Sequence, residues 1–335
     1  MKSDTQLPWT AQSLLDLVRG YQAAAVLVAA AEIDLFAALA SDSRTACALA
    51  QDLKCDLRAL TILLDALAAQ GLLQKSADAY SLPAGLEAFL TPGGEQTVVA
   101  MLQHQANCLR NWSQLAKVTK TGKPAQRIAS VRGEAGDKES FIGAMHNVSG
   151  PNAARVIKAI KPLEFKHLLD IGGASGTWTI AFLRGCPTAQ ATLFDLAHVI
   201  PMAKRQLEQA GLAQRVRLVP GDFLTDALPS GADLAWVSAI VHQNSREQNR
   251  LLFSKAFSAL LPGGRIAIRD MLMDETRTRP VAGAFFAVNM LVATEGGGTF
   301  TREELSEDLR CAGFTDAVVA HQDEGMNSVL VARKP

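Results

Sequence analysis

Three acidic residues follow three successive apolar runs in the second half of the chain, and their side chains could hold a polar or cationic ligand. Asp170 ends "HLLD", Asp195 ends "ATLFD", and Asp222 follows "VRLVPG". Each run is typical of a buried strand. The carboxyl ends of parallel strands share one edge of a doubly wound sheet, so we expect the three carboxylates to line one ligand crevice.

A glycine-rich loop, "DIGGASG", begins at Asp170 and leads into a predicted helix. Its glycines allow a tight turn and a close approach of a ligand to the backbone. The dinucleotide fingerprint G-x-G-x-x-G does not fit, because Ala174 and Thr177 occupy its second and third glycine positions and a carboxylate would repel a pyrophosphate. S-adenosylmethionine, which carries an ammonium and a sulfonium, suits Asp170 better.

The same strand edge offers partners for the rest of such a nucleoside. Asp195 is 25 residues beyond Asp170 and can accept hydrogen bonds from both ribose hydroxyls, as the acid after a Rossmann loop does. Asp222 can accept from the adenine amino group, and Phe223 offers an aromatic face to the ring. A simpler alternative stays open, because glycines can serve the turn alone and a strand-end aspartate can cap a helix.

A histidine stands where the next apolar run, "DLAWVSAIV", ends. His242 would lie at the ligand edge of the sheet, and an unperturbed imidazole pKa of about 6.5 suits a general base near neutral pH. The alternative is a histidine that only packs or caps at the strand end. His104 and His146 are on predicted helices, where a histidine more often belongs to the core or the surface, although His146 is next to Met145.

The sequence from His167 onward predicts the strands and helices that position these residues. Short apolar runs alternate with amphipathic segments, which predicts an α/β, Rossmann-like fold with a mostly parallel sheet. The last two runs, "DAVVAH" and "NSVLVAR", are close together and predict a hairpin with one antiparallel strand. We expect this domain to span residues 161–335, after connecting helices in 106–160 that are interrupted by loops at "TGKPAQ" and "RGEAGDKES".

Residues 1–105 predict a separate helical domain of the winged-helix type. Helices over Ala46–Gln51 and Leu57–Gln70, a stop at Gly71 and two short strands around "KSADA" give this pattern. The domain has six basic and eleven acidic side chains. DNA binding is therefore not expected, because DNA affinity depends on neutralising phosphates. Apolar helices over Ala11–Ala40 favour a subunit interface and hence a homodimer.

The composition limits the partners and the location of the 335-residue chain. With 33 basic and 33 acidic side chains and a pI near 7.0, the chain has no net charge to attract nucleic acid or an anionic membrane. The apolar stretch Ala23–Ala31 is too short to span a bilayer. Five cysteines without a C-x-x-C pair predict a reducing, cytoplasmic location, and no residue cluster has the spacing of a metal site.

With these motifs in place, nearly the whole chain resembles the S-adenosylmethionine-dependent O-methyltransferases that act on plant phenolics, acetylserotonin and bacterial polyketides. The similarity rests on "LLDIGGASG", "FDLAHVI", "RVRLVPGDF", "LLPGGRIAIRD" and "NMLVATEGG", in this order. It implies a class I methyltransferase domain with a seven-stranded sheet, preceded by a dimerisation domain. It also implies methyl transfer to a hydroxyl group, with S-adenosylhomocysteine as the product and no metal.

The resemblance assigns a role to individual residues. His242 takes the position of the family's catalytic histidine, and Asp270 takes that of the acid that supports it. Eight residues would bind the cofactor: Asp170, Gly172, Gly173, Gly176, Asp195, Asp222, Phe223 and Ser238. Four residues would line the acceptor pocket: Met145, His146, Asn289 and Met290.

The sequence departs from the family pattern next to His242. Gln243 and Asn244 replace the usual Asp-Trp pair, and Thr299 stands where plant members have a second supporting glutamate. Two alternatives stay open. One keeps the fold and cofactor but performs N- or C-methylation, hydroxylation or decarboxylation. The other is a winged-helix regulator that senses a ligand, against which the acidic N-terminal domain argues.

Overall fold

A computed structural model of the chain describes residues 9–160 and 164–335, apart from the side chains of residues 146–149 and 151. The chain forms two compact units. The first consists of Met1–Arg110 and Ile128–Asn147, and the second of Asn111–Arg127 and Val148–Pro335. A single long helix, α9 (Gly133–Ala159), contributes to both units.

The first unit contains the helices and the small sheet that the winged-helix pattern predicts. Its elements besides α9 are α1 (Ala11–Arg19), α2 (Tyr21–Glu32), α3 (Leu35–Ala38), β1 (Arg44–Thr45), α4 (Ala46–Leu53), α5 (Leu57–Ala69), β2 (Gln74–Ser76), β3 (Ala79–Ser81), α6 (Glu87–Leu90) and most of α7 (Val99–Trp112). The sheet has the order β1-β3-β2, one strand more than predicted. Helix α5 begins where Asp56 accepts the N–H of Ala59, and it ends before Gly71, whose φ of +74° favours glycine.

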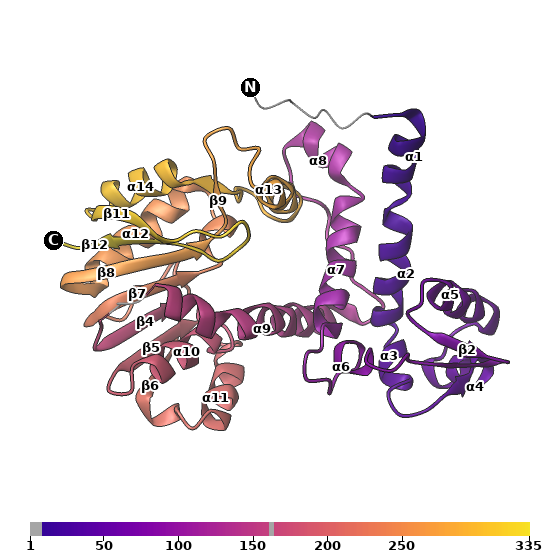
Figure 1. The fold of residues 1–335 in the computed structure, drawn as a ribbon. Helices are drawn as coiled ribbons and strands as arrows, with labels where there is room; N and C mark the ends of the chain where they lie inside the picture. Colours follow the sequence, from indigo (N-terminus) through magenta and orange to yellow (C-terminus); the bar gives the residue numbers. More distant parts are fainter. Residues whose placement is uncertain (1–8, 161–163) are drawn as a thin grey trace. The chain divides into compact units, whose positions relative to one another are not determined.

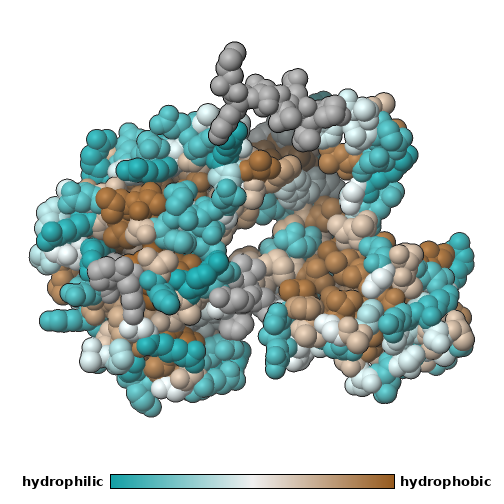
Figure 2. Space-filling model, viewed as in Figure 1, coloured by the Kyte–Doolittle hydropathy of each residue, from teal (hydrophilic) through white to brown (hydrophobic). Residues whose placement is uncertain are grey.

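Helix α1 and the start of α2 present large apolar side chains at the surface of the first unit, and Figure 2 shows hydrophobic surface on this unit in brown. The exposed residues are Leu14, Leu15, Leu17, Val18 and Tyr21. The segment Ala11–Glu32 is long and apolar enough to cross a membrane, a property that core helices share. Its second half is partly buried within the unit, at Val28, Ala30 and Ala31.

The prediction of a loop at "RGEAGDKES" is wrong, because helix α9 begins at Gly133 and runs through this stretch. Its polar side chains find partners within the protein. Asp137 accepts the N–H of Ser130, and Ser140 donates to the side-chain oxygen of Gln103 in α7. Such tertiary contacts outweigh the low helix propensity of the glycines in this segment.

The second unit contains a seven-stranded sheet in the order β11-β12-β8-β7-β4-β5-β6. Its strands are β4 (His167–Ile171), β5 (Gln190–Asp195), β6 (Val216–Pro220), β7 (Ala232–Ser238), β8 (Leu260–Asp270), β11 (Thr315–His321) and β12 (Ser328–Arg333). All neighbours pair in parallel except β12, which is antiparallel to both β8 and β11. The predicted Rossmann-like sheet with one antiparallel strand is confirmed.

Helices cover both faces of this sheet (Figure 1). The apolar core under α12 and α14 includes Phe253 and Leu305, and the core on the other face, under α10, α11 and the end of α9, includes Trp178 and Trp236. The remaining elements are α8 (Leu115–Thr121), α10 (Thr177–Gly185), α11 (Ile200–Gln209), η1 (Ala213–Arg215), η2 (Val241–Gln243), α12 (Arg246–Ala259), β9 (Leu272–Met273), α13 (Val281–Ala293), β10 (Phe300–Thr301) and α14 (Arg302–Cys311). The predicted loop at "TGKPAQ" follows α8.

Candidate active site

The C-terminal ends of five parallel strands bring most of the predicted site residues to one edge of the sheet. Asp170 is the second-to-last residue of β4. Asp195, Ser238 and Asp270 are the final residues of β5, β7 and β8. Asp222 follows β6 by two residues. Because these five strands run in parallel, the five side chains belong to the same edge.

The glycine loop is held tightly against strand β5. Gly172 has a φ of +69° and donates its N–H to the carbonyl of Phe194 at 2.8 Å. A Cβ at Gly173 would lie 2.6 Å from Cγ of Leu193, closer than real side chains approach. Gly176, with a φ of +79°, then begins helix α10. The loop therefore needs glycine at these positions, because it turns through positive φ and packs closely against β5.

Asp195 is fixed by two backbone amides. The N–H groups of Ala174 and Leu196 donate to its two carboxylate oxygens, each at 2.7 Å. Burial raises the pKa of Asp195, and these two hydrogen bonds oppose that shift. The carboxylate is thus held in a defined orientation beside the glycine loop, where its remaining lone pairs can accept further hydrogen bonds.

Asp170 lies beneath the glycine loop rather than at an open position. Its side chain is 1% exposed and accepts a hydrogen bond of 2.5 Å from the hydroxyl of Thr179 in α10. Burial raises its pKa to about 7, with a smaller contribution from the nearby charge of Asp195. The Asp170 carboxylate has almost no exposed surface, and its predicted role in binding a cationic ligand stays a prediction. Thr179 was not identified from the sequence.

The segment after β6 folds into a closed turn. Asp222 accepts the N–H of Leu224 on one carboxylate oxygen at 2.8 Å and donates its own N–H to Asp226. Phe223 is partly buried and packs against the core under α12. Asp222 and Phe223 thus lie next to each other after the end of β6, and their assignment to adenine stays a prediction.

Ser238 has a partner that the sequence did not reveal. Arg269 in β8 is 2% exposed and donates one N–H to the hydroxyl oxygen of Ser238 at 3.0 Å. It also donates twice to the side-chain oxygen of Asn327 and lies 4.6 Å from the ring centre of Trp178. Burial lowers the pKa of Arg269 to about 10. Since Ser238 accepts from arginine, its own hydroxyl hydrogen is left to donate elsewhere.

His242 and Asp270 form the closest pair of ionisable side chains at this edge. Nδ1 of His242 lies 2.9 Å from both carboxylate oxygens of Asp270, and the two residues are 6% and 1% exposed. A carboxylate can only accept, so Nδ1 carries the hydrogen and Nε2 of a neutral ring carries the lone pair. The ring of Phe286 in α13 packs edge-on against the imidazole, with 4.8 Å between the two ring centres. This arrangement fits a general base oriented by an acid.

The residues that replace the family's Asp-Trp pair have structural partners. Asn244 is buried and donates to the side-chain oxygen of Asn249, which in turn donates to the carbonyl of Val241. Gln243 is exposed, and its amide donates to the carbonyl of Ala239. The amide chain therefore closes the turn that carries His242 without an aromatic residue.

Two of the residues predicted to line the acceptor pocket lie on helix α13 in the second unit. Asn289 accepts a hydrogen bond of 2.9 Å from the indole N–H of Trp112, and Met290 is buried. The indole can only donate, so the oxygen of Asn289 faces Trp112 and its NH₂ group points away from it. Met145 is half-buried on the part of α9 that belongs to the first unit, and the side chain of His146 lies outside the described residues. Trp112 was missed because its partner is far away in sequence.

Two further polar positions have packing roles. Thr299 is buried and supplies a backbone carbonyl to Arg277, so no carboxylate stands at that position. His104 lies 3.6 Å from the sulfur of Cys108, packs edge-on against Phe141, and has its pKa lowered by burial. In the part of the chain that the structure describes, no group of three or more His, Cys, Asp or Glu residues could hold a metal ion.

Protein-family models match both parts of the chain. An O-methyltransferase domain matches residues 119–315, which include the whole strand edge described above. An O-methyltransferase dimerisation domain matches residues 15–91, within the first unit.

Individual relatives match almost the full length. A 3-hydroxy-5-methyl-1-naphthoate 3-O-methyltransferase of Streptomyces sahachiroi is 30% identical, covering 96% of this chain and 94% of the relative. The N,N-dimethyltransferase OxyT of Streptomyces rimosus is 28% identical, covering 97% of each chain. The crystal structure of human N-acetylserotonin methyltransferase in complex with S-adenosylmethionine has a TM-score of 0.82 at 25% identity, covering 98% of this chain and 99% of that one. With its matching methyltransferase and dimerisation domains, this chain belongs to the S-adenosylmethionine-dependent O-methyltransferase family of enzymes.

Proposed function

We propose that this enzyme transfers a methyl group to a hydroxyl of a small aromatic or polyketide-like metabolite, with His242 as the general base. The observation that carries the proposal is the contact of Nδ1 of His242 with both oxygens of Asp270 at 2.9 Å. This contact leaves Nε2 as the basic atom at the ligand edge of the sheet. The proposal includes a homodimer formed through the N-terminal domain and a cytoplasmic location, in keeping with five free cysteines.

The residues at the strand edge suit S-adenosylmethionine, which supplies an electrophilic methyl group when bound. Gly172, Gly173 and Gly176 would bind the methionine end, and close packing against Ile240 and Leu193 fixes the backbone at Gly172 and Gly173. The fixed carboxylate of Asp195 would accept from the ribose hydroxyls. Asp222 and Phe223 would bind adenine, and the hydroxyl of Ser238 would donate to the remaining edge. Asp170 would stabilise the loop from beneath by accepting from Thr179, and its ionised form, which a nearby cation favours, would add negative potential.

His242 and Asp270 would handle the proton of the acceptor. A phenol with a pKa of about 10 is mostly protonated at neutral pH, so removal of its proton makes the oxygen a better nucleophile. The proton passes to Nε2 of His242, and the carboxylate of Asp270 stabilises the imidazolium that forms. Holding the acceptor oxygen near the methyl group would supply much of the remaining rate enhancement.

Helix α13 would select the acceptor. Phe286 touches the imidazole ring, so residues one turn away on this helix are within reach of the reacting hydroxyl. Asn289 would direct its NH₂ group to an oxygen of the acceptor, and Met290 would add a flexible apolar wall. Met145 and His146 remain proposed acceptor-binding residues. The relatives named for a hydroxynaphthoate and for N-acetylserotonin favour a flat aromatic acceptor.

The test is methyl transfer from labelled S-adenosylmethionine to a panel of phenols and hydroxynaphthoates. We expect His242→Ala to lower kcat by about 10²- to 10⁴-fold and Asp270→Asn to lower it as well, with S-adenosylhomocysteine binding retained. His167→Gln is the matched control, because this histidine lies at the opposite end of β4, where it contacts Thr192. Unchanged turnover in His242→Ala would contradict the base role.

A second candidate is methyl transfer to nitrogen on the same scaffold. It is favoured by the similarity to the N,N-dimethyltransferase OxyT, and by the loss of the family's Asp-Trp pair after His242. An aromatic amine is already nucleophilic when neutral, so it needs a base less than a phenol does. Methylation of amines but not phenols in the same panel, with no effect of His242→Ala, would favour this candidate.

A further inference from the structure

Lys255 in helix α12 binds three backbone carbonyls of one loop. Its Nζ atom lies 2.9 Å from the oxygen of Phe223, 2.8 Å from that of Leu224 and 2.9 Å from that of Asp226. A lysine ammonium has three N–H groups, so each one has a separate acceptor. Hydrogen bonds from a charged donor are stronger than those between neutral groups, so this contact fixes the loop firmly.

The same loop is closed on its other side by Asp222. The N–H of Leu224 donates to the Asp222 carboxylate at 2.8 Å, and the N–H of Asp226 donates to the Asp222 carbonyl at 2.7 Å. In return, the N–H of Asp222 donates to the Asp226 carboxylate. Backbone N–H groups of the loop therefore point toward Asp222, while three backbone carbonyls of the loop converge on Lys255. A cation is needed where carbonyl dipoles converge, because they repel one another without it.

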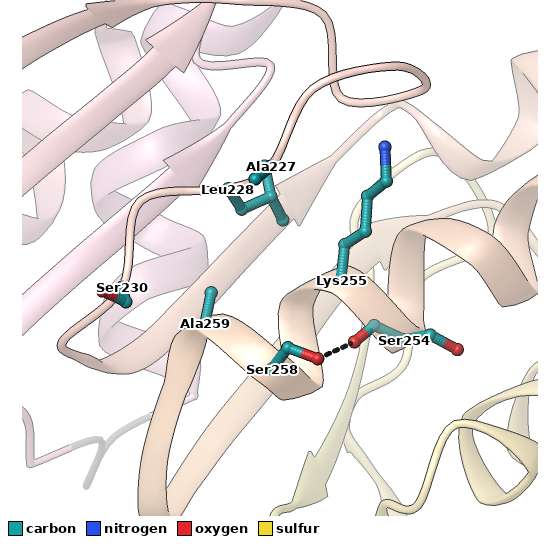
Figure 3. A pocket seen from close by; sticks show the side chains of 7 residues that line it. All are labelled: Ala227, Leu228, Ser230, Ser254, Lys255, Ser258 and Ala259. Atoms are coloured by element: carbon teal, nitrogen blue, oxygen red, sulfur yellow. Dashed lines mark hydrogen bonds between the residues drawn. The ribbon is translucent and has the colours of Figure 1, made fainter.

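Lys255 also borders a surface groove of about 280 Å³, shown in Figure 3. In this view the lysine side chain points away from Ser258 and Ala259, toward the loop that precedes Ala227. The hydroxyls of Ser254 and Ser258 donate to carbonyls one turn earlier in the same helix. The side chains of Ser254 and Ser258 are thus already paired within helix α12, and the ammonium of Lys255 is bound to the loop.

We propose that Lys255 is a positioning residue for adenine recognition, and that it acts by holding the loop 222–226 in the conformation that presents Asp222 and Phe223. The inference rests on the proposed assignment of these two residues to the adenine ring. The side chain itself does not touch the ligand. Removing the ammonium releases the three carbonyls. The loop then loses the geometry by which Asp222 distinguishes the amino group of adenine from an oxygen at the same position of the purine.

The experiment measures binding of S-adenosylhomocysteine by titration calorimetry in wild type, Lys255→Met, Lys255→Arg and Lys334→Met. Lys334 is the matched control, because its ammonium also binds two backbone carbonyls, those of Phe257 and Leu260, at the opposite end of β8. We expect Lys255→Met to raise Kd about tenfold, Lys255→Arg to restore most of the affinity, and Lys334→Met to bind like wild type. If Lys255→Met does not fold, Lys255→Gln replaces it.

Two readouts separate positioning from a general loss of stability. S-inosylhomocysteine carries an oxygen in place of the adenine amino group, and the ratio of its Kd to that of S-adenosylhomocysteine should fall toward one in Lys255→Met. Amide hydrogen exchange of residues 224–226 in the free protein should become faster in the same variant. Unchanged affinity and unchanged discrimination in Lys255→Met would overturn the proposal. Binding requires no acceptor, so failure of hydroxyl methylation would leave this result intact.

Discussion

Asp170 shows how a single buried carboxyl can couple the stability of the protein to pH. It is 1% exposed and bonded to a hydroxyl, and its pKa is about 7 instead of the ordinary 3.8. Between these pH values the folded protein keeps a proton that the unfolded chain releases. The free energy of unfolding therefore falls as the pH rises from about 4 to about 7, and it stays lower above that range. Full ionisation corresponds to a loss of about 4 kcal/mol.

We expect Asp170→Asn to remove this pH dependence. Relative to wild type, the melting temperature of the variant should rise as the pH increases from 5 to 8, because only the wild-type residue ionises over that range. Thermal unfolding at several pH values measures the difference. Asp316→Asn, at an exposed carboxylate on β11, is the control and should follow the wild-type profile. A constant difference between Asp170→Asn and wild type at all pH values would contradict the prediction.

The site residues that the sequence predicts are recognised by their position in a local pattern, whereas the residues that were missed are defined by contacts with distant parts of the chain. Asp195, His242 and Asp270 follow apolar runs, so their position at strand ends can be read from the chain. Arg269 stands within such a run, and its role depends on Asn327, 58 residues away in sequence. Trp112 depends on a partner 177 residues away. Single-sequence patterns report local periodicity, and they contain no information on which distant side chains will meet.

At the scale of elements, a glycine-rich loop after α13 supports the turn that carries His242. Gly298 donates its N–H to the carbonyl of His242 at 2.9 Å, and Arg277 binds the carbonyl of Thr299 at 3.0 Å. The parallel pair β9 and β10 lies next to this loop, with Phe300 opposite Leu272. The turn that carries His242 is therefore held from two sides, by Asp270 on β8 and by the loop 294–299.

Close packing in this loop predicts a contrast between two neighbouring glycines. A Cβ at Gly297 would lie 2.5 Å from the carbonyl oxygen of His242, whereas a Cβ at Gly298 meets nothing within 4 Å. We expect Gly297→Ala to displace the turn and lower kcat by at least about tenfold, because the imidazole of His242 would lose its alignment with the acceptor. Gly298→Ala should keep wild-type kcat. Steady-state kinetics with saturating cofactor measures both, and equal kcat values for the two variants would show that the loop does not hold His242.

The predictable and unpredictable elements of the fold differ for a physical reason. The strands β4, β5 and β7 are apolar runs buried on both faces, and such runs are recognisable without any partner. The first turns of α9 are rich in glycine and charge, so local propensity favours a loop. Their helical state depends on contacts such as Ser140 with Gln103, which a local pattern does not contain.

At the scale of the whole molecule, the two compact units are not consecutive in sequence. The first unit takes Ile128–Asn147 in addition to the N-terminal residues, and the second takes Asn111–Arg127. Sequence patterns divide the chain into consecutive segments at residues 105 and 160. A division of this kind cannot show that each unit consists of two separate segments. The dimerisation domain of the family nevertheless matches residues 15–91, which include the apolar helix α2 and most of α1.

The exposed apolar residues of α1 predict where a second copy of the chain binds. Val18 is 67% exposed within one chain, and a carboxylate at this position would have to be buried in the proposed subunit interface at a high cost in free energy. We expect Val18→Asp to shift the protein from dimer to monomer at micromolar concentration, as measured by analytical ultracentrifugation. Val318→Asp, at a 54% exposed position on β11, is the matched control and should remain dimeric. A Val18→Asp variant that sediments like wild type would place the subunit contact elsewhere on the molecule.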